Sequence, residues 1–440
     1  MSNSATSAQL GYPSAAIDTA PRTGWGTWIL LAGMMFLQYA VWGLWLLPLP
    51  QYLGAAPAQG GLGFTAGQTG WILALGGAFG AVTAPFAGQI ADRYLNAEKT
   101  LGLLLFIGGF VNFALSYTTD YTVFLFLSIA YSILYMPTLP LTNSVSFQNL
   151  ADPTKEFPPI RMFGTIGWAV AAGVFPWVWL GTNDPVENTR RIADALRASG
   201  ALSIIYAAYC FFLLPKTPPK PSAEPLAFAK ALRLFGHRGF AVVALMALPI
   251  AVIHMAFFFR FFPFLTGPVQ IPTKYAGFVT SIGQYSEMFF LAILGLLLKR
   301  LGFKTVLAIG IFGYALRFAI FSMIQPWWLI AAAQTLHGLC YAFFYAAAYI
   351  YVEKVAPADI RHSAQTVFGF LILGVGPILA GVYNQYAPRD PKTFWLLEAG
   401  IALAAMLVLL AAFRDTGPME TKDEAPRGFP VTTPASAETA

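Results

Sequence analysis

Residues 216–237 read KTPPKPSAEPLAFAKALRLFGH, a proline-rich and basic stretch that lies between long apolar segments. It is the longest hydrophilic connection between two such segments, and six of them precede it and six follow it. A hydrophilic linker between two equal sets is expected where a membrane protein is built from two related halves. The stretch therefore predicts two pseudo-repeated six-helix bundles, at 26–215 and 238–415, with tails at 1–25 and 416–440 that we expect to be disordered.

The apolar segments on both sides of this linker are long enough to cross a bilayer. About 20 mainly apolar residues are needed to span roughly 30 Å of hydrocarbon. Twelve segments meet this length, near 27–53, 69–90, 100–118, 121–147, 158–181, 196–215, 239–265, 275–298, 304–324, 327–353, 362–387 and 393–413. No segment alternates with the period of two that a β-barrel needs, and unpaired backbone is costly in lipid. The sequence therefore predicts an all-α membrane protein with twelve transmembrane helices.

Composition excludes several other classes of protein. Only 10% of the 440 residues are charged and the mean hydropathy is +0.62, whereas soluble domains carry roughly 25% charged residues. The net charge of +6 is not gathered into a basic stripe, so we expect no nucleic-acid partner. Cys210 and Cys340 lie far apart in apolar segments, which argues against a disulfide framework or a metal site. Neither clustered nucleophiles nor a phosphate-binding loop suggests an enzyme, and no filter repeat suggests a channel, so both remain less favoured alternatives.

Loop charges predict the orientation of the helices. The loops after segments 2, 4, 6, 8 and 10 carry Arg93 and Lys99; Lys155; Lys216, Lys220, Lys230, Arg233 and Arg238; Lys299, Arg300 and Lys304; Lys354 and Arg361. The loops after segments 1, 3 and 9 carry none, although Arg190 and Arg191 break the pattern after segment 5. Because positive loops stay on the cytoplasmic side, both termini are expected in the cytoplasm.

Glu287 is the most informative ionisable residue. It lies in the middle of an apolar segment, in GQYSEMFF (283–290), with no cation within one helical turn. An apolar environment disfavours the charged form of a carboxyl group, so Glu287 is a candidate to bind and release a proton. Gln284 lies on the same helical face and adds an amide suited to hydroxyl groups. The alternative is a structural hydrogen bond between helices.

Arg161 and Thr165 share one face of the fifth segment, four residues apart. Arg161 either snorkels to the headgroups or reaches inward as a partner for Glu287 or for ligand oxygens. His254 and His337 are further ionisable candidates, as packing residues, ligand contacts or proton relays. Arg317 and Glu353 are expected to make cytoplasmic or interhelical pairs instead of contacting a ligand.

Two further segments carry polar or aromatic patterns. Pro137 and Pro140 lie in one segment and predict a bent helix of the kind that is tolerated beside a cavity. Gln38, Trp42 and Trp45 follow one side of the first segment. A tryptophan stripe is more often interface or packing than a binding surface, but Gln38 at mid-depth favours a cavity.

A loop motif occurs twice, six segments apart. GQIADR (88–93) follows the second segment, and GLLLKR (295–300) follows the eighth. At this place in a twelve-segment chain, Gly88, Asp92 and Arg93 resemble the cytoplasmic gating-loop signature of the major facilitator superfamily.

A more specific resemblance covers residues 30 to 413. It is carried by the runs FLQ (36–38), WG (42–43), WL (45–46), YMPTL (135–139), FPPIR (157–161), GTIG (164–167), SE (286–287), LRFA (316–319), VEK (352–354), IR (360–361) and SAQ (363–365). Together these resemble the nucleoside:proton symporter family, a bacterial branch of that superfamily. The resemblance implies a monomeric inner-membrane transporter that imports nucleosides by proton symport and alternating access, with the proton as coupling ion and no other cofactor. A transporter of a sugar, a nucleobase or a drug on the same fold is the alternative.

The resemblance also assigns site residues. It implies a ligand held by Arg161, Thr165, Gln284 and Glu287, with Trp168 as a neighbouring aromatic side chain. Where the family has Gln and Asn this chain has His254 and Phe257, and where it has Tyr and Phe this chain has His337 and Tyr341. An Asp linked to transport in the family is Ala342 here, so either Glu287 or a histidine is left to carry the proton.

Overall fold

The computed structural model describes residues 23–93, 95–218, 232–357, 361–415 and 417, without the side chains of 81, 84–93, 154 and 361–363. All regular secondary structure in this part of the chain is helical. The longer elements are α1 (Trp25–Gly43), α2 (Leu49–Gly54), α3 (Ala66–Arg93), α4 (Ala97–Tyr117), α5 (Tyr121–Tyr135), α6 (Thr138–Asn149), α7 (Pro153–Trp179), α8 (Pro185–Arg191), α9 (Ala193–Phe212), α11 (Arg238–Thr266), α12 (Thr273–Phe321), α13 (Trp327–Ala333), α14 (Thr335–Cys340), α15 (Ala347–Val355), α16 (Arg361–Phe370), α17 (Gly376–Tyr386) and α18 (Pro391–Ala412). Short 3₁₀ turns are η1 (Pro57–Gln59) and η2 (Leu232–Gly236), and π-helical turns are η3 (Tyr341–Ala346) and η4 (Leu371–Val375).

The twelve predicted spans are present, and several of them are interrupted. Within the described residues, nine helical stretches are long and apolar enough to cross a membrane by length and composition, and α3 and the two arms of α12 make up the remaining spans. The arms of α12 meet at Gly302, whose φ of 73° suits a residue without a Cβ. Pro137 lies between α5 and α6, so the fourth span is interrupted beside one of its two prolines.

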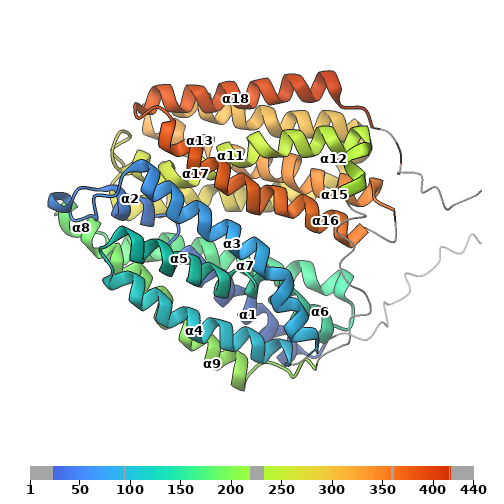
Figure 1. Ribbon diagram of the computed structural model, residues 1–440, viewed down its shortest axis with the longest axis horizontal. Coiled ribbons are helices and arrows are strands. Elements are labelled where there is room, and N and C mark those ends of the chain that lie inside the picture. The colour runs from blue at the N-terminus through green and yellow to red at the C-terminus, as the bar shows by residue number, and fades with distance from the viewer. Residues whose placement is uncertain (1–22, 94, 219–231, 358–360, 416, 418–440) are drawn as a thin grey trace, which may run out of the picture.

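The helices form two bundles that lie side by side (Figure 1). The N-terminal half contains α1 to α9 and the C-terminal half contains α11 to α18. One end of the molecule, here called the linker end, carries Thr23, Thr217 and Arg414, where Thr217 bonds the start of α4. The opposite end, here called the far end, carries α2 and α8 (Figure 1).

The two halves are joined through the far part of their interface. Gln51 Oε1 accepts a hydrogen bond from Thr266 Oγ1 at 3.0 Å, and Asn384 Nδ2 donates to the Ala66 carbonyl at 2.8 Å. Gly277 packs so tightly that a Cβ there would come 1.8 Å from the Ala172 carbonyl oxygen. These contacts close the halves against each other at the far end.

The exception in the loop-charge pattern lies on the short helix α8. Arg190 and Arg191 both form ion pairs with Glu187, at 3.2 Å and 2.9 Å. One glutamate offsets at most one of the two arginines, and the positive-inside rule counts Lys and Arg and not net charge. This loop therefore remains an exception to the predicted orientation.

The tight contact at Gly277 predicts how the halves move. Gly277→Ala should wedge α12 from α7 and shift the molecule toward a state that is open at the far end, because the added methyl group would meet backbone. The measurement is the distance between spin labels at Gln59 and Gln270, which are exposed on opposite halves of the far end. Gly295→Ala is the matched control, since no atom lies within 4 Å of a Cβ there. Unchanged distances in both variants would contradict the assignment of this contact as the far-end closure.

Candidate functional site

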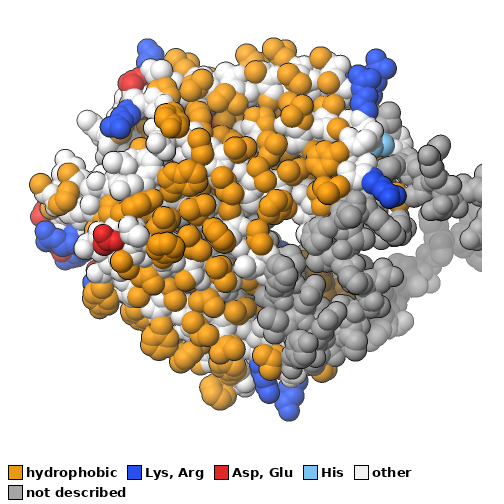
Figure 2. Space-filling view, viewed as in Figure 1, with side chains coloured by type: hydrophobic (Ala, Val, Ile, Leu, Met, Phe, Trp, Pro, Cys, Tyr) orange, Lys and Arg blue, Asp and Glu red, His pale blue; other side chains and the backbone are white. Residues whose placement is uncertain are grey.

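A cavity of about 1420 Å³ lies between the two halves. Its walls come from both bundles and reach Val82, Pro140 and Phe370 toward the linker end. In Figure 2 a hollow is visible between the halves on that side of the molecule. The far-end contacts close the other side, so the cavity is accessible from one end only.

The structure brings the predicted site residues to this one cavity. Arg161, Thr165 and Trp168 on α7, His254 on α11, Gln284 and Glu287 on α12, His337 on α14 and Tyr341 on η3 all line it. Their spacings of three and four residues place each set on one helical face. Two faces from different halves therefore oppose each other across the cavity.

Arg161 points inward. Its guanidinium lies over the Tyr39 ring, 4.2 Å from the ring centre, and it lines the cavity instead of reaching the headgroups. Gly164 provides the room, because a Cβ there would lie 2.8 Å from Arg161 Nη1 and 2.6 Å from the Tyr39 ring. The N-terminal half thus presents one positive charge to the cavity from this position.

Glu287 presents a carboxyl group from the opposite half. The helix α12 comes so close to α14 at this point that a Cβ on Gly338 would lie 2.1 Å from the Glu287 backbone nitrogen. Gly338 therefore sets the depth at which the Glu287 side chain enters the cavity. Arg161 acts on it electrostatically across the cavity. No hydrogen bond or ion pair within the described part of the chain holds the carboxyl group, so it is available to a ligand or a proton.

Aromatic side chains form the wall of the N-terminal half. The Trp42 and Trp168 rings meet edge to face at 5.2 Å, and both line the cavity together with Trp45. Their indole nitrogen atoms are buried, and the hydrogen-bond geometry gives them no acceptor among the described residues. The three side chains therefore contribute ring surface to this wall and no exposed donors.

The expectation for Gln38 was wrong. Gln38 is fully buried inside the N-terminal half, where its amide donates to Thr138 Oγ1 at 2.6 Å, and it lies outside the cavity lining. Tyr39, one residue later, takes the cavity position that the sequence reasoning missed. The spacing of Tyr39, Trp42 and Leu46, all on the lining, is the sequence signal that could have identified the correct face.

Wide helical turns shape the wall of the C-terminal half. The π-helical turn η3 begins at Tyr341, whose ring lines the cavity, and η4 places Leu373 on the same lining. Turns of this kind are often found at functional sites because they redirect a side chain within a continuous helix. A reading based on a constant helical period does not reveal them.

The two histidines lie against each other beneath this wall. Their rings stack with centres 5.5 Å apart. Nδ1 of His254 lies 2.8 Å from Tyr314 Oη, and Nδ1 of His337 lies 3.0 Å from Arg317 Nη1. Arg317 was expected to form either a cytoplasmic or an interhelical pair. It is fully buried, so the interhelical alternative is observed.

The remaining predicted residues are peripheral. Glu353 accepts a hydrogen bond from Gln365 at 3.1 Å near the linker end. Helix α3 extends to Arg93, but the side chains of Gly88, Asp92 and Arg93 lie outside the described residues. The proposed gating role of that loop therefore stays a prediction.

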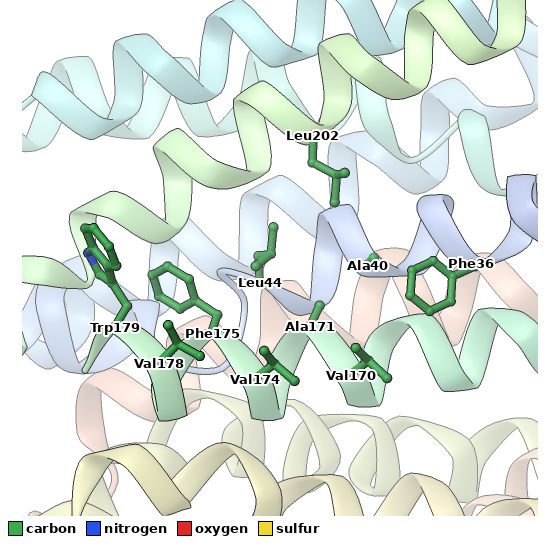
Figure 3. Close-up of a pocket in the computed structure, with 10 residues that line it drawn as sticks. All are labelled: Phe36, Ala40, Leu44, Val170, Ala171, Val174, Phe175, Val178, Trp179 and Leu202. Atoms are coloured by element: carbon green, nitrogen blue, oxygen red, sulfur yellow. The ribbon is translucent and has the colours of Figure 1, made fainter. Parts of the chain in front are cut away.

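A second hollow is unsuited to a polar solute. It lies among α1, α7 and α9, and residues such as Phe36, Val174 and Leu202 line it (Figure 3). All of its lining side chains are apolar apart from the Trp179 indole N–H. Val174 and Val178 are exposed on the outside of the bundle. We therefore assign the solute site to the central cavity.

Two helical bundles around one central cavity define a solute transporter of the major facilitator type. Comparison with known proteins specifies the family: the chain belongs to the nucleoside H⁺ symporter family, whose profile matches residues 26–417. Xanthosine permease of Escherichia coli (strain K12) is 30% identical over 410 residues, 87% of this chain and 94% of that protein. The crystal structure of the nucleoside transporter NupG superposes with a TM-score of 0.77 at 27% identity, over 89% of this chain and all of that one. The structure of a D-xylose-proton symporter shares the fold, with a TM-score of 0.68 at 13% identity over 88% and 97% of the chains.

The geometry predicts one-sided access to the cavity. A thiol introduced by Thr165→Cys should react with a membrane-impermeant methanethiosulfonate reagent from the linker side and be protected from the far side. Gln38→Cys is the matched control and should not react from either side, because Gln38 is fully buried outside the cavity. The native Cys210 and Cys340 are both buried, so their background reaction should be small. Equal labelling of Thr165→Cys from both sides would contradict the one-sided cavity.

Proposed function

We propose that this chain imports nucleosides across the bacterial inner membrane by proton symport, with alternating access to the central cavity. The observation that carries this is a cavity between the halves that combines a free carboxyl group, an arginine and several aromatic rings. Small-molecule pockets usually measure about 300–1,000 Å³, so a volume of about 1420 Å³ has room for a nucleoside and water. One chain forms the whole cavity, which supports a monomer as the functional unit.

The loop charges support an inward-facing state. The loops at the linker end carry cations such as Lys99, Arg233 and Lys299, and they carry more of them than the loops at the far end, where Arg190 and Arg191 lie. By the positive-inside rule the linker end is then cytoplasmic and both termini lie inside. In this orientation the cavity opens to the cytoplasm, which is the state that releases an imported solute.

The chemistry of the two walls suits the two parts of a nucleoside. A flat base can stack on rings such as Trp168 and Tyr341, an interaction that tolerates different bases. Gln284 and Glu287 offer an amide and a carboxyl group to the ribose hydroxyl groups, while Arg161 and Thr165 offer donors from the opposite half. Buried polar partners penalise a solute that lacks the matching hydroxyl, and this gives selectivity for the sugar.

Proton coupling follows from the position of Glu287 between the halves. When the cavity closes around the solute, a carboxylate that loses its water must gain a proton or a cationic partner. Arg161 on the opposite half is the cation that can pair with it in the empty transporter. If protonation and solute binding favour each other in the outward-facing state, the inward proton gradient drives accumulation.

Replacement of the carboxyl group tests the coupling step. Glu287→Gln should lose pH-driven accumulation of uridine, so that the ratio of internal to external uridine falls to about one, because a neutral amide cannot exchange a proton. Exchange of external labelled uridine for internal unlabelled uridine should persist, since exchange needs alternating access but no net proton movement. Both quantities are measured in the same proteoliposomes.

Glu398→Gln provides the control for that experiment. Glu398 is likewise a carboxyl group in a membrane helix, α18, but it is fully buried and lies outside the cavity lining. This variant should accumulate uridine as the wild type does. Concentrative uptake by Glu287→Gln at the wild-type level would remove Glu287 from the coupling mechanism.

A further inference from the structure

Arg317 is a buried cation in the C-terminal half whose surroundings contain no acidic partner. Its side chain is fully buried on the second arm of α12. Two of its nitrogens donate to Gln334 Oε1, at 3.1 Å and 2.6 Å, and the Phe257 ring lies 4.0 Å from the guanidinium carbon. In the described residues no carboxylate pairs with it. A buried charge is costly, so one retained in this way is a candidate for a functional role.

The third contact of Arg317 reaches the cavity through His337. Arg317 Nη1 lies 3.0 Å from His337 Nδ1. A guanidinium group carries donors only, so the hydrogen in this bond belongs to Arg317 and Nδ1 must be the acceptor. The single proton of a neutral imidazole then resides on Nε2.

His337 combines this tautomer with a place on the cavity wall. It is only 4% exposed, but it is part of the cavity lining. Because Nδ1 is engaged by Arg317, Nε2–H is the only polar group of the ring that remains for a ligand. The titratable and charged groups that face this ring are Arg317 and His254, and neither supplies the negative charge that would stabilise an imidazolium.

We propose that Arg317 is a positioning residue that fixes His337 as a neutral Nε2–H donor, and that this donor selects nucleosides by an oxo group on the base. This rests on the proposed function and deepens it. A fixed donor accepts no hydrogen bond, so an exocyclic amino group at the same place on the base is left without a partner. The arrangement also removes His337 from the proton route, which leaves Glu287 and His254 as the candidates for that task.

His254 is a useful contrast within the same site. Its Nδ1 faces Tyr314 Oη at 2.8 Å, and a hydroxyl group can donate or accept. The tautomer of His254 is therefore not fixed by its partner. Replacing Tyr314 and replacing Arg317 should have different consequences, although both partners are buried beside neighbouring histidines.

The test compares the binding of uridine with that of its two analogues that lack one oxo group, pyrimidin-2-one riboside and pyrimidin-4-one riboside. Calorimetry on the full-length protein in detergent gives each affinity. In the wild type, one analogue should bind roughly tenfold more weakly than uridine, because the Nε2–H donor then lacks its acceptor. In His337→Leu and in Arg317→Met, the ratio of the affinity for uridine to the affinity for that analogue should fall toward one. In Tyr314→Phe it should stay as in the wild type.

The ratio separates positioning from a purely structural role. A loss of fold or of general affinity lowers the binding of uridine and its analogues together, whereas the loss of one donor changes only their ratio. If Arg317→Met does not yield folded protein, Gln334→Leu removes the acceptor that holds the same guanidinium and carries the same expectation. A discrimination that persists in His337→Leu, or in folded Arg317→Met or Gln334→Leu, would overturn the inference.

The outcomes for the two proposals are distinguishable. If no nucleoside binds to the wild type, the proposed function fails. If uridine binds but both analogues bind as tightly as uridine, the function stands and the role assigned to Arg317 and His337 is wrong.

Discussion

The structure depends on the cost of polar groups in hydrocarbon. Backbone amides and carbonyls in a bilayer must be satisfied within the chain, which makes helices the only spanning structure available to this sequence. The same cost restricts ionisable side chains to places where water, a ligand or another polar group can meet them. Arg161 and Glu287 are therefore found where the two halves separate, and the cavity between them is where chemistry can take place.

Closure at the far end determines the side from which the cavity is accessible. The hydrogen bonds that Thr266 donates to Gln51 and Asn384 donates to Ala66 hold the halves together on one side, and tight backbone contact at Gly277 supports them. A transporter must break such contacts once per cycle, so a few hydrogen bonds and small residues suit this interface better than a large apolar seam. Glu287 and Arg161 lie on opposite halves, which allows one protonation event to bias the same movement.

Length and hydropathy were sufficient to predict the membrane-spanning helices, because about 20 apolar residues per span leave few alternatives. The arrangement in two related halves was predicted from the linker and from the family resemblance. Arg161, Gln284 and Glu287, which the family resemblance assigned to the ligand, line the cavity. Cost alone would not have selected them, since Arg317 and Glu398 are ionisable residues buried outside the cavity lining. The prediction for Gln38 was wrong because a buried amide can form a hydrogen bond with a neighbouring helix, here with Thr138, as readily as with a ligand. The π-helical turn at Tyr341 and the partner of His337 depend on packing between helices, which no local pattern contains.

The most direct test is uptake of labelled uridine into proteoliposomes that hold the purified protein, with and without an imposed inward proton gradient. Accumulation above the external concentration when the outside is acidic, and simple equilibration when the gradient is collapsed, is the result expected of a nucleoside symporter with a titrating carboxyl group between its halves. Uptake that is the same under both conditions, or that is absent while a sugar or a free base is transported, would contradict the account.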